Sequence, residues 1–267
     1  NGEKVVMSEI ADINASTEAD FLRMAALYNT IRKKPLADSV YTIVKAKYPK
    51  GTYVYNQAAN AIYSEKDAAK KEEKLALIIK DFNLDATKAA NFYATIASAY
   101  STAKNNEKFE EYAKKIESKM TVAQLYNSYA WAGAEKKENL EFAAKISKMS
   151  LDLIEAAKGD PVPAIYASKE EYLEGLTASY AMYADTYAVL LDHLGKSAEA
   201  LKFQEIAVTQ NKFSNPEMNA RYVSFLVKAG QKDKVLTYAA RFIKEGQGTA
   251  QMKADLKSVY NGSQPFE

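Results

Sequence analysis

Small and apolar residues recur along this chain with a spacing that predicts pairs of packed helices. The clearest pair covers residues 181–214, where Gly195 is expected to end the first helix and Ser197 to open the second. Ala200 and Ala207 lie seven residues apart, so they share one face of the second helix and let it approach its partner closely. The pattern therefore predicts a helix–turn–helix unit in this stretch.

The same unit recurs with the period of tetratricopeptide repeats, which place small residues at fixed positions of both helices. The first frame begins at Glu18 and fits best, and the others begin at Thr52, Ala90, Gln124, Ala181 and Pro216. The frame from Thr52 is atypical, because Lys71 stands where a small residue is expected. No segment has a convincing strand pattern. We therefore predict an all-α fold, a tetratricopeptide-like α-α superhelix (solenoid) of about six antiparallel helix pairs.

The strength of this pattern divides the chain into four predicted segments. They are an N-terminal arm over residues 1–16, an N-terminal helical-repeat array over 17–158, a loop or hinge over 159–168, and a C-terminal helical-repeat array with a capping helix over 169–267. The loop contains Gly159, Pro161 and Pro163, which interrupt the helical pattern. This interruption is why a hinge between two arrays is predicted there.

Helix-capping residues support these boundaries. Thr17, or alternatively Ser16, is expected to cap the first helix. Ser168 with Glu171 has the spacing of a capping box ahead of a long helix over residues 169–194. A last helix over about residues 250–260 would cover the exposed end of the stack, because a repeat buries its faces only against neighbours.

Composition excludes several classes of partner. Lys and Arg number 36 and Asp and Glu 34, so the chain has no general attraction to nucleic acid, and we expect no nucleic-acid partner. No apolar run approaches the length of a membrane-spanning helix. Cysteine is absent, which excludes disulfides, thiolate metal sites and a cysteine nucleophile within these residues. The chain begins at Asn1 without an initiator methionine, as after removal of a signal peptide or at a chosen start.

Catalytic and cofactor motifs are not found in the sequence. His193 is the only histidine, and no G-x-S-x-G elbow accompanies it, so a serine-hydrolase triad is not expected. No P-loop, G-x-G-x-x-G fingerprint or aspartate-rich calcium loop occurs, and one histidine without cysteine gives no metal site. We interpret His193 as a groove or surface residue and Trp131 as a core residue. The expected protein is not an enzyme and has no cofactor or metal.

The first helices of the repeats suggest a binding groove instead. Positions expected on the concave side carry neutral amide, tyrosine and hydroxyl side chains, namely Asn29, Tyr53, Asn56, Asn60, Tyr63, Asn91 and Ser98. Such groups can bind the backbone of an extended peptide, or the hydroxyls of a sugar. The corresponding C-terminal positions are mixed in charge and less suggestive, namely Asp185, Val189, Asp192, His193, Ser224 and Lys228.

Part of the chain resembles a known family. The run N-S-Y-A-W at Asn127–Trp131, with Ala143 and Ser150, and the run D-T-Y-A-V-L-L-D-H-L-G-K at Asp185–Lys196 are similar to the helical-repeat region of bacterial thioredoxin-like proteins. The tail LKSVYNGSQPFE resembles the segment that leads into a TlpA-like thiol–disulfide reductase domain. The resemblance covers about residues 90–267. The family's catalytic C-x-x-C motif does not occur in this chain, so no catalytic residue is carried over.

The resemblance and the repeat pattern together give the expected function. We expect a non-catalytic helical-repeat module that binds a protein or peptide and is part of, or related to, an exported thioredoxin-like protein. The resemblance implies a periplasmic location, or a cell-envelope lipoprotein. The alternative is an envelope solenoid that binds glycans or small molecules through Tyr53, Tyr63 and other exposed rings. The sequence leaves the oligomeric state open.

Overall fold

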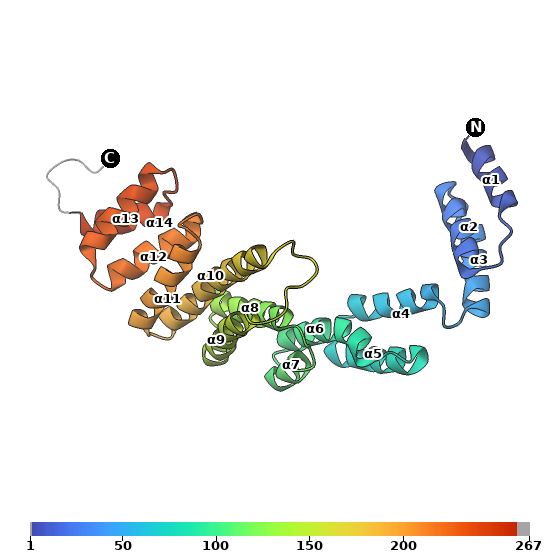
Figure 1. The fold of residues 1–267 in the computed structure, drawn as a ribbon, viewed down its shortest axis with the longest axis horizontal. Helices are drawn as coiled ribbons and strands as arrows, with labels where there is room; N and C mark the ends of the chain where they lie inside the picture. Colours follow the sequence, from blue (N-terminus) through green and yellow to red (C-terminus); the bar gives the residue numbers. More distant parts are fainter. Residues whose placement is uncertain (1, 261–267) are drawn as a thin grey trace. The chain divides into compact units, whose positions relative to one another are not determined.

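The computed structural model describes residues 2–260, and over these residues it contains fourteen α-helices and no strand (Figure 1). The first seven helices are α1 (Gly2–Asp12), α2 (Glu18–Thr30), α3 (Lys34–Lys47), α4 (Thr52–Ser64), α5 (Ala68–Phe82), α6 (Ala86–Thr102) and α7 (Asn106–Ala113). The other seven are α8 (Lys119–Lys136), α9 (Leu140–Ala157), α10 (Lys169–His193), α11 (Ser197–Gln210), α12 (Pro216–Lys228), α13 (Lys232–Lys244) and α14 (Ala250–Val259).

Consecutive helices pack in pairs, as the repeat pattern predicts. Contacts join α2 to α3, α4 to α5, α8 to α9, α10 to α11 and α12 to α13. The rings of Tyr93 and Tyr112, 6.0 Å apart, join α6 to α7. This arrangement of adjacent helix pairs confirms the predicted all-α fold class.

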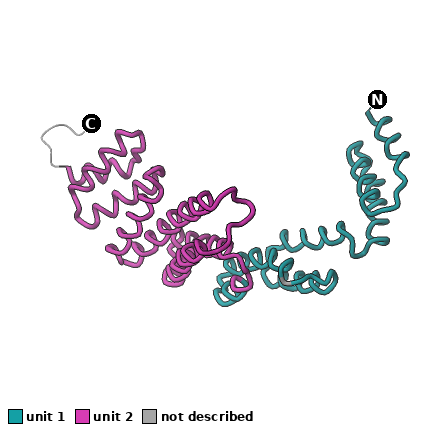
Figure 2. Tube along the Cα trace, viewed as in Figure 1, with its two compact units in different colours: residues 1–112 teal, residues 113–267 magenta. Residues whose placement is uncertain are grey.

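The chain divides into two compact units, residues 1–112 and residues 113–267 (Figure 2). The division does not fall at the loop over residues 159–168, where a hinge was predicted. That loop lies inside the second unit, where α10 packs on both α8 and α9. Leu151 and Ile154 of α9 share one core with Tyr172 and Leu176 of α10, so the hydrophobic core continues past the loop.

The first residues form a helix where the sequence predicted an arm. Helix α1 buries one residue, Ile10, and ion pairs attach it to the following helices. Glu9 accepts a hydrogen bond from Arg23 at 2.5 Å, and Glu3 pairs with Lys33 at 2.8 Å. The weak apolar periodicity of this segment reflects the small surface that it buries.

The predicted caps are present at both helix starts. The Thr17 hydroxyl accepts from the Asp20 amide, while the Asp20 carboxylate accepts from the Thr17 amide at 2.9 Å. The Ser168 hydroxyl accepts from the Glu171 amide at 3.1 Å. The Glu171 carboxylate, however, accepts from the amide of Ala167, one residue before the position that a capping box requires.

The small positions of the repeat are buried where the pattern is regular. In the first frame these residues are Ala25, Ala37 and Val44, and in the fifth they are Ala188, Ala200 and Ala207. All six are fully buried, so the spacing correctly identified where helices approach closely. Gly195 ends α10 with a φ of +75°, a conformation that glycine adopts without strain.

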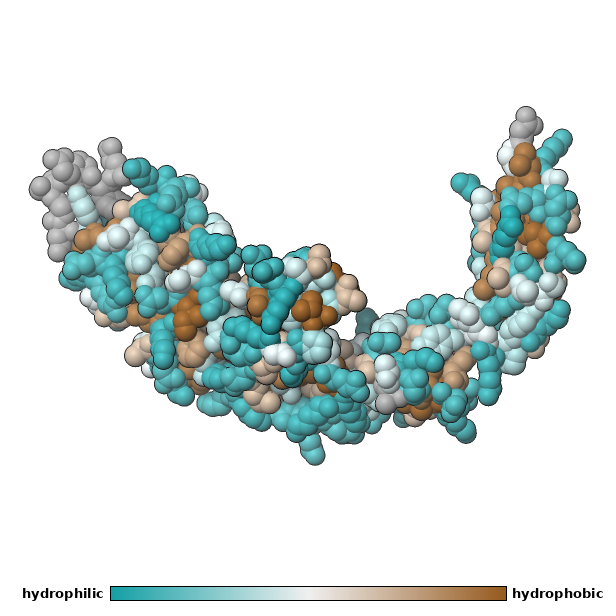
Figure 3. Space-filling model, viewed as in Figure 1, coloured by the Kyte–Doolittle hydropathy of each residue, from teal (hydrophilic) through white to brown (hydrophobic). Residues whose placement is uncertain are grey.

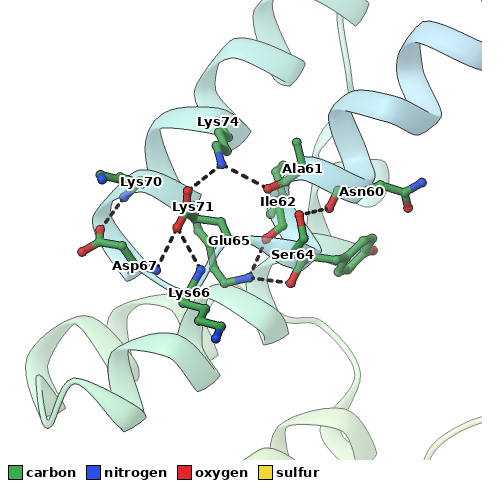
Figure 4. A network of polar contacts seen from close by, with 11 residues as sticks. Asn60, Ala61, Ile62, Ser64, Glu65, Lys66, Asp67, Lys70, Lys71 and Lys74 are labelled. Carbon is green, nitrogen blue, oxygen red and sulfur yellow. Dashed lines mark hydrogen bonds and ion pairs between the residues drawn. The ribbon is translucent and has the colours of Figure 1, made fainter.

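Lys71 occupies the small position of the second frame and is nonetheless buried, 4% exposed. Its ammonium group donates to the backbone carbonyls of Ile62 and Tyr63, which lie in the last turn of α4 (Figure 4). The last carbonyls of a helix have no partner within the helix. Lys71 therefore caps α4 from α5, and its long side chain replaces the close helix approach that a small residue allows.

The last helix closes the C-terminal unit as predicted. Met252, Leu256 and Val259 of α14 join the core formed by α12 and α13. The N-cap is Thr249, whose hydroxyl accepts from the Met252 amide at 3.1 Å. Residues 261–267, which include most of the tail used for the family resemblance, lie outside the described residues.

Candidate functional site

Asn29 and Tyr53 were predicted to line a groove, but both contact other side chains within the first unit. Asn29 donates to the Tyr41 hydroxyl at 3.2 Å, and the Tyr41 ring stacks on Tyr53 with centroids 4.8 Å apart. Gln57 donates to the Tyr53 hydroxyl at 2.8 Å, and burial raises the pKa of that hydroxyl. These contacts connect α2, α3 and α4. Asn29 and Tyr53 therefore stabilise the packing of these helices.

The other predicted residues form exposed faces on two helices. Asn56, Asn60 and Tyr63 have the spacing of one face of α4, and Tyr63 is 51% exposed. The Asn60 side chain points away from the Lys71 network (Figure 4). Asn91 and Ser98 are exposed on α6. The Tyr63 ring contacts Phe92 of α6 at 5.5 Å, which is the link between these two faces.

The charged residues predicted for the C-terminal groove all form ion pairs within the second unit. Asp185 is 4% exposed and accepts from Arg221 through both oxygens, at 2.9 and 2.6 Å, and from Gln204 at 2.7 Å. Asp192 pairs with Lys228 at 2.6 Å. Ser224 donates to Asp255. His193 and Val189 are partly buried, so this set mainly joins α10, α12 and α14.

Trp131 is partly buried rather than fully in the core. Its ring lies under the guanidinium group of Arg221, 5.9 Å from the ring centroid. Since Arg221 also pairs with Asp185, this contact links α8, α10 and α12 within the second unit. The Trp131 ring therefore stabilises the packing of α8, α10 and α12, which are the first helices of successive repeats.

A cavity of about 620 Å³ lies in the C-terminal unit between α8, α10 and the loop that joins α9 to α10. We call it the α8–α10 groove. Its polar lining residues are Ser118, Thr121, Gln124, Asn127, Ser128 and Ser179. Its apolar and aromatic lining residues are Met120, Ile154, Pro163, Ile165, Tyr166, Met182 and Tyr183.

Helical spacing explains why these residues meet. Thr121, Gln124 and Ser128 repeat every three or four residues and so share one face of α8. On α10, Met182 and Tyr183 lie three and four residues after Ser179, so these residues also share one face. The loop adds Pro163 and Ile165 from the segment that was predicted to be a hinge.

Several hydroxyl groups of the groove already donate a hydrogen bond within the protein. Ser128 donates to the Gln124 carbonyl at 2.9 Å, and Ser179 donates to the Gly175 carbonyl at 2.9 Å. Thr121 donates to the Ser118 hydroxyl at 3.0 Å. Each hydroxyl oxygen also has acceptor lone pairs, so these side chains can accept hydrogen bonds from a ligand.

Two further polar groups of the groove make no hydrogen bond to the described residues. The Asn127 side-chain oxygen is buried without a partner. Tyr183 is 7% exposed, and burial raises the pKa of its hydroxyl, which therefore stays neutral at ordinary pH. Buried polar groups are normally satisfied, so an unpaired acceptor here favours a ligand that donates.

The mouth of the groove carries exposed apolar side chains. Ile165 is 85% exposed and Met182 is 48% exposed, whereas hydrophilic residues cover most of the face seen in Figure 3. Tyr166 holds the loop in place, because its ring packs on Tyr172 with centroids 5.0 Å apart. Exposed apolar groups beside a cavity are typical of interaction sites.

The sequence pattern could not reveal this groove. Met182 does stand at a position of the fifth frame that the repeat pattern predicts to face a groove, next to Ala181, where that frame begins. One wall of the site, however, comes from Pro163, Ile165 and Tyr166 of the α9–α10 loop, whose path depends on the packing of Tyr166 against Tyr172. The spacing of the repeats does not predict the path of a loop that lies between two of them.

Comparisons with known proteins identify no family. No protein-family model matches this chain, and a search of curated proteins gives no match either. Within residues 2–260, no three His, Asp or Glu side chains are grouped so that they could hold a metal ion. None of the helices in that part of the chain is both long and apolar enough to cross a bilayer.

Proposed function

We propose that this chain is a non-catalytic helical-repeat module that binds extended peptide segments in the α8–α10 groove. The observation that carries the proposal is the groove itself, a cavity of about 620 Å³ with exposed apolar groups at its mouth and unpaired polar groups on its lining. An extended peptide presents both chemistries, since its backbone is polar and its side chains alternate in direction. The proposed partner is therefore a protein or peptide.

An array of capped octapeptides tests this proposal against the full chain. We expect saturable binding by a subset of the peptides, with an affinity that Met182→Lys lowers by about tenfold or more, because a charge replaces an apolar contact. Leu77→Lys is the matched control, since Leu77 is a 58% exposed apolar residue of α5 outside the groove. Absence of binding, or equal loss in both variants, would contradict the proposal.

A second candidate, an envelope solenoid that binds glycans or small molecules, is favoured by the exposed face of α4. Tyr63 presents a ring that is 51% exposed, three residues from the exposed amide of Asn60. A half-exposed ring beside an amide can stack on a sugar and bind its hydroxyls. A glycan array should then show binding that Tyr63→Ala abolishes. If no glycan on the array binds, this function is excluded.

Export and association with a thioredoxin fold are proposed on the sequence resemblance alone. The residues that support it are Asn127–Trp131 and Asp185–Lys196. Sequencing the source gene beyond both ends of this chain tests the proposal. A signal peptide before Asn1 and a C-x-x-C thioredoxin fold after Glu267 would support it, and a reading frame with neither would remove it.

A further inference from the structure

We infer that the α8–α10 groove selects uncharged peptide segments and binds their backbone amides through Asn127 and Tyr183. This inference rests on the proposed function, and it specifies the chemistry of the ligand. Three features of the groove carry it: the charge of its lining, the balance of donors and acceptors, and the burial of its rings.

The lining of the groove carries no formal charge, although 26% of the residues of the chain are charged. One charged neighbour of the lining forms its ion pair outside the groove. Lys119, next to Ser118 and Met120, pairs with Asp160 of the loop at 2.5 Å and also donates to the Ala156 carbonyl. A charged ligand group would lose water in the groove without gaining an opposite charge, so the groove disfavours it.

The polar groups of the groove match the two halves of a peptide group. The Asn127 oxygen is a buried acceptor without a partner, and it can receive a backbone N–H. The Tyr183 hydroxyl is neutral and makes no hydrogen bond to the described residues, so it can donate to a backbone carbonyl. Ser128 and Ser179 add acceptors, because their protons are held by Gln124 and Gly175.

The aromatic residues of the groove disfavour a sugar as its occupant. Sugar binding usually requires an open ring face for stacking. Tyr183 is only 7% exposed, and Tyr166 packs on the Tyr172 ring. Met182 and Ile165 instead provide flexible apolar contact for the side chains of an uncharged peptide.

Matched peptides and a matched pair of variants test the inference. Capped octapeptides of equal length are prepared with no charge, with one central Glu and with one central Lys, and their binding to the full chain is measured by fluorescence anisotropy. We expect each charge to weaken binding by about tenfold or more. We expect Asn127→Leu to weaken binding of the uncharged peptide by about tenfold, and Tyr183→Phe by at least about threefold.

The control is Gln210→Leu, because Gln210 also has a buried side-chain oxygen without a partner but lies outside the groove. It should leave peptide affinity unchanged. Asn127→Leu should melt at the wild-type temperature or above, since it removes an unsatisfied polar group, so lost binding is not lost folding. Methylating the peptide nitrogen that Asn127 contacts should weaken wild-type binding and leave binding to Asn127→Leu unaffected.

The outcomes separate this inference from the proposed function. If no peptide of any charge binds, the proposed function fails and the inference fails with it. If peptides bind and Met182→Lys weakens them, but charged peptides bind equally well or Asn127→Leu changes nothing, the proposed function stands and the inference is overturned. Saturable binding of a neutral oligosaccharide that Asn127→Leu abolishes would also overturn it.

Discussion

Lys71 donates a hydrogen bond from its buried ammonium group to the backbone carbonyl of Ile62, nine residues earlier in the chain. The same group reaches the Tyr63 carbonyl at 3.2 Å and the Thr95 hydroxyl at 3.5 Å. Burial lowers the pKa of Lys71, because the charged ammonium group is partly removed from water. The contact therefore joins the end of α4 to α5 at a position where the repeat pattern expects a small residue.

Replacing Lys71 with the small residue of the pattern should destabilise the protein. Lys71→Ala would leave a cavity and two carbonyls without their donor, so we expect urea unfolding to show a loss of about 3 kcal/mol. Lys70→Ala, at the exposed neighbouring position, should change stability by less than about 0.5 kcal/mol. An unchanged or raised stability for Lys71→Ala would show that the cap contributes nothing.

The buried pair of Asp185 and Arg221 should be important for stability rather than for ligand binding. Asp185→Ala leaves the partly buried guanidinium group without its partner and should cost about 3 kcal/mol in urea unfolding. Asp185→Leu combined with Arg221→Met should recover most of that loss, because neither charge then remains. Asp192→Ala, which breaks a pair whose lysine is 51% exposed, should cost about 1 kcal/mol or less. Equal losses for both aspartates would contradict this distinction.

Glu65 should make the N-terminal unit sensitive to acid. A hydrogen bond from Lys74 and two from the amides of Asp67 and Lys66 lower the pKa of Glu65 from 4.5 to about 2. A lowered folded-state pKa stabilises the fold above pH 4.5, and this contribution is lost as the pH falls from 4.5 towards 2.

An NMR titration of the Glu65 carboxyl carbon measures this pKa directly. Over the same pH range, Glu65→Gln should lose less stability than the wild type, because its side chain does not titrate. Glu73→Gln, at an exposed position of α5, should keep the wild-type response. An ordinary pKa for Glu65 would contradict the prediction.

Gly133 allows the close approach of α8 to α9. A Cβ atom at this position would lie 2.9 Å from the Cβ of Ala143 and 3.1 Å from the Glu138 carbonyl oxygen. Gly133→Ala should therefore lower the melting temperature, because overpacking costs about 1–3 kcal/mol and exceeds the gain in helix propensity. Gly175→Ala on α10 is the control: the new Cβ would make ordinary contacts of 3.5 Å or more, and stability should be unchanged or higher. A higher melting temperature for Gly133→Ala would contradict this account.

The sequence predicted the elements whose cause is local. Thr17, Ser168 and Pro216 stand at the helix starts that they predict, since capping acts over a few residues. Ala200 and Ala207 are fully buried, as their spacing on one helix face predicts. Helix α1 was missed, because its short apolar face gives little periodicity to read.

The features that depend on tertiary packing could not be predicted. Asp185 was assigned to a groove by its repeat position, but Arg221 and Gln204 approach from other helices and bury it. Asn29 and Tyr53 were assigned in the same way, yet Tyr41 accepts a hydrogen bond from Asn29 and stacks on the Tyr53 ring. The α8–α10 groove depends on a loop that belongs to no repeat, so its residues were not recognised as a set.

Methyl NMR of the seven methionines can locate the peptide-binding site, because Met120 and Met182 line the α8–α10 groove and the other five do not. Titration of the full chain with the tightest-binding uncharged octapeptide should shift the methyl signals of Met120 and Met182. The signals of Met24 in the first unit and of Met218 and Met252 in the C-terminal core should stay in place. Shifts confined to Met24, or peptide binding without any change at Met120 and Met182, would contradict the assignment of the groove as the binding site.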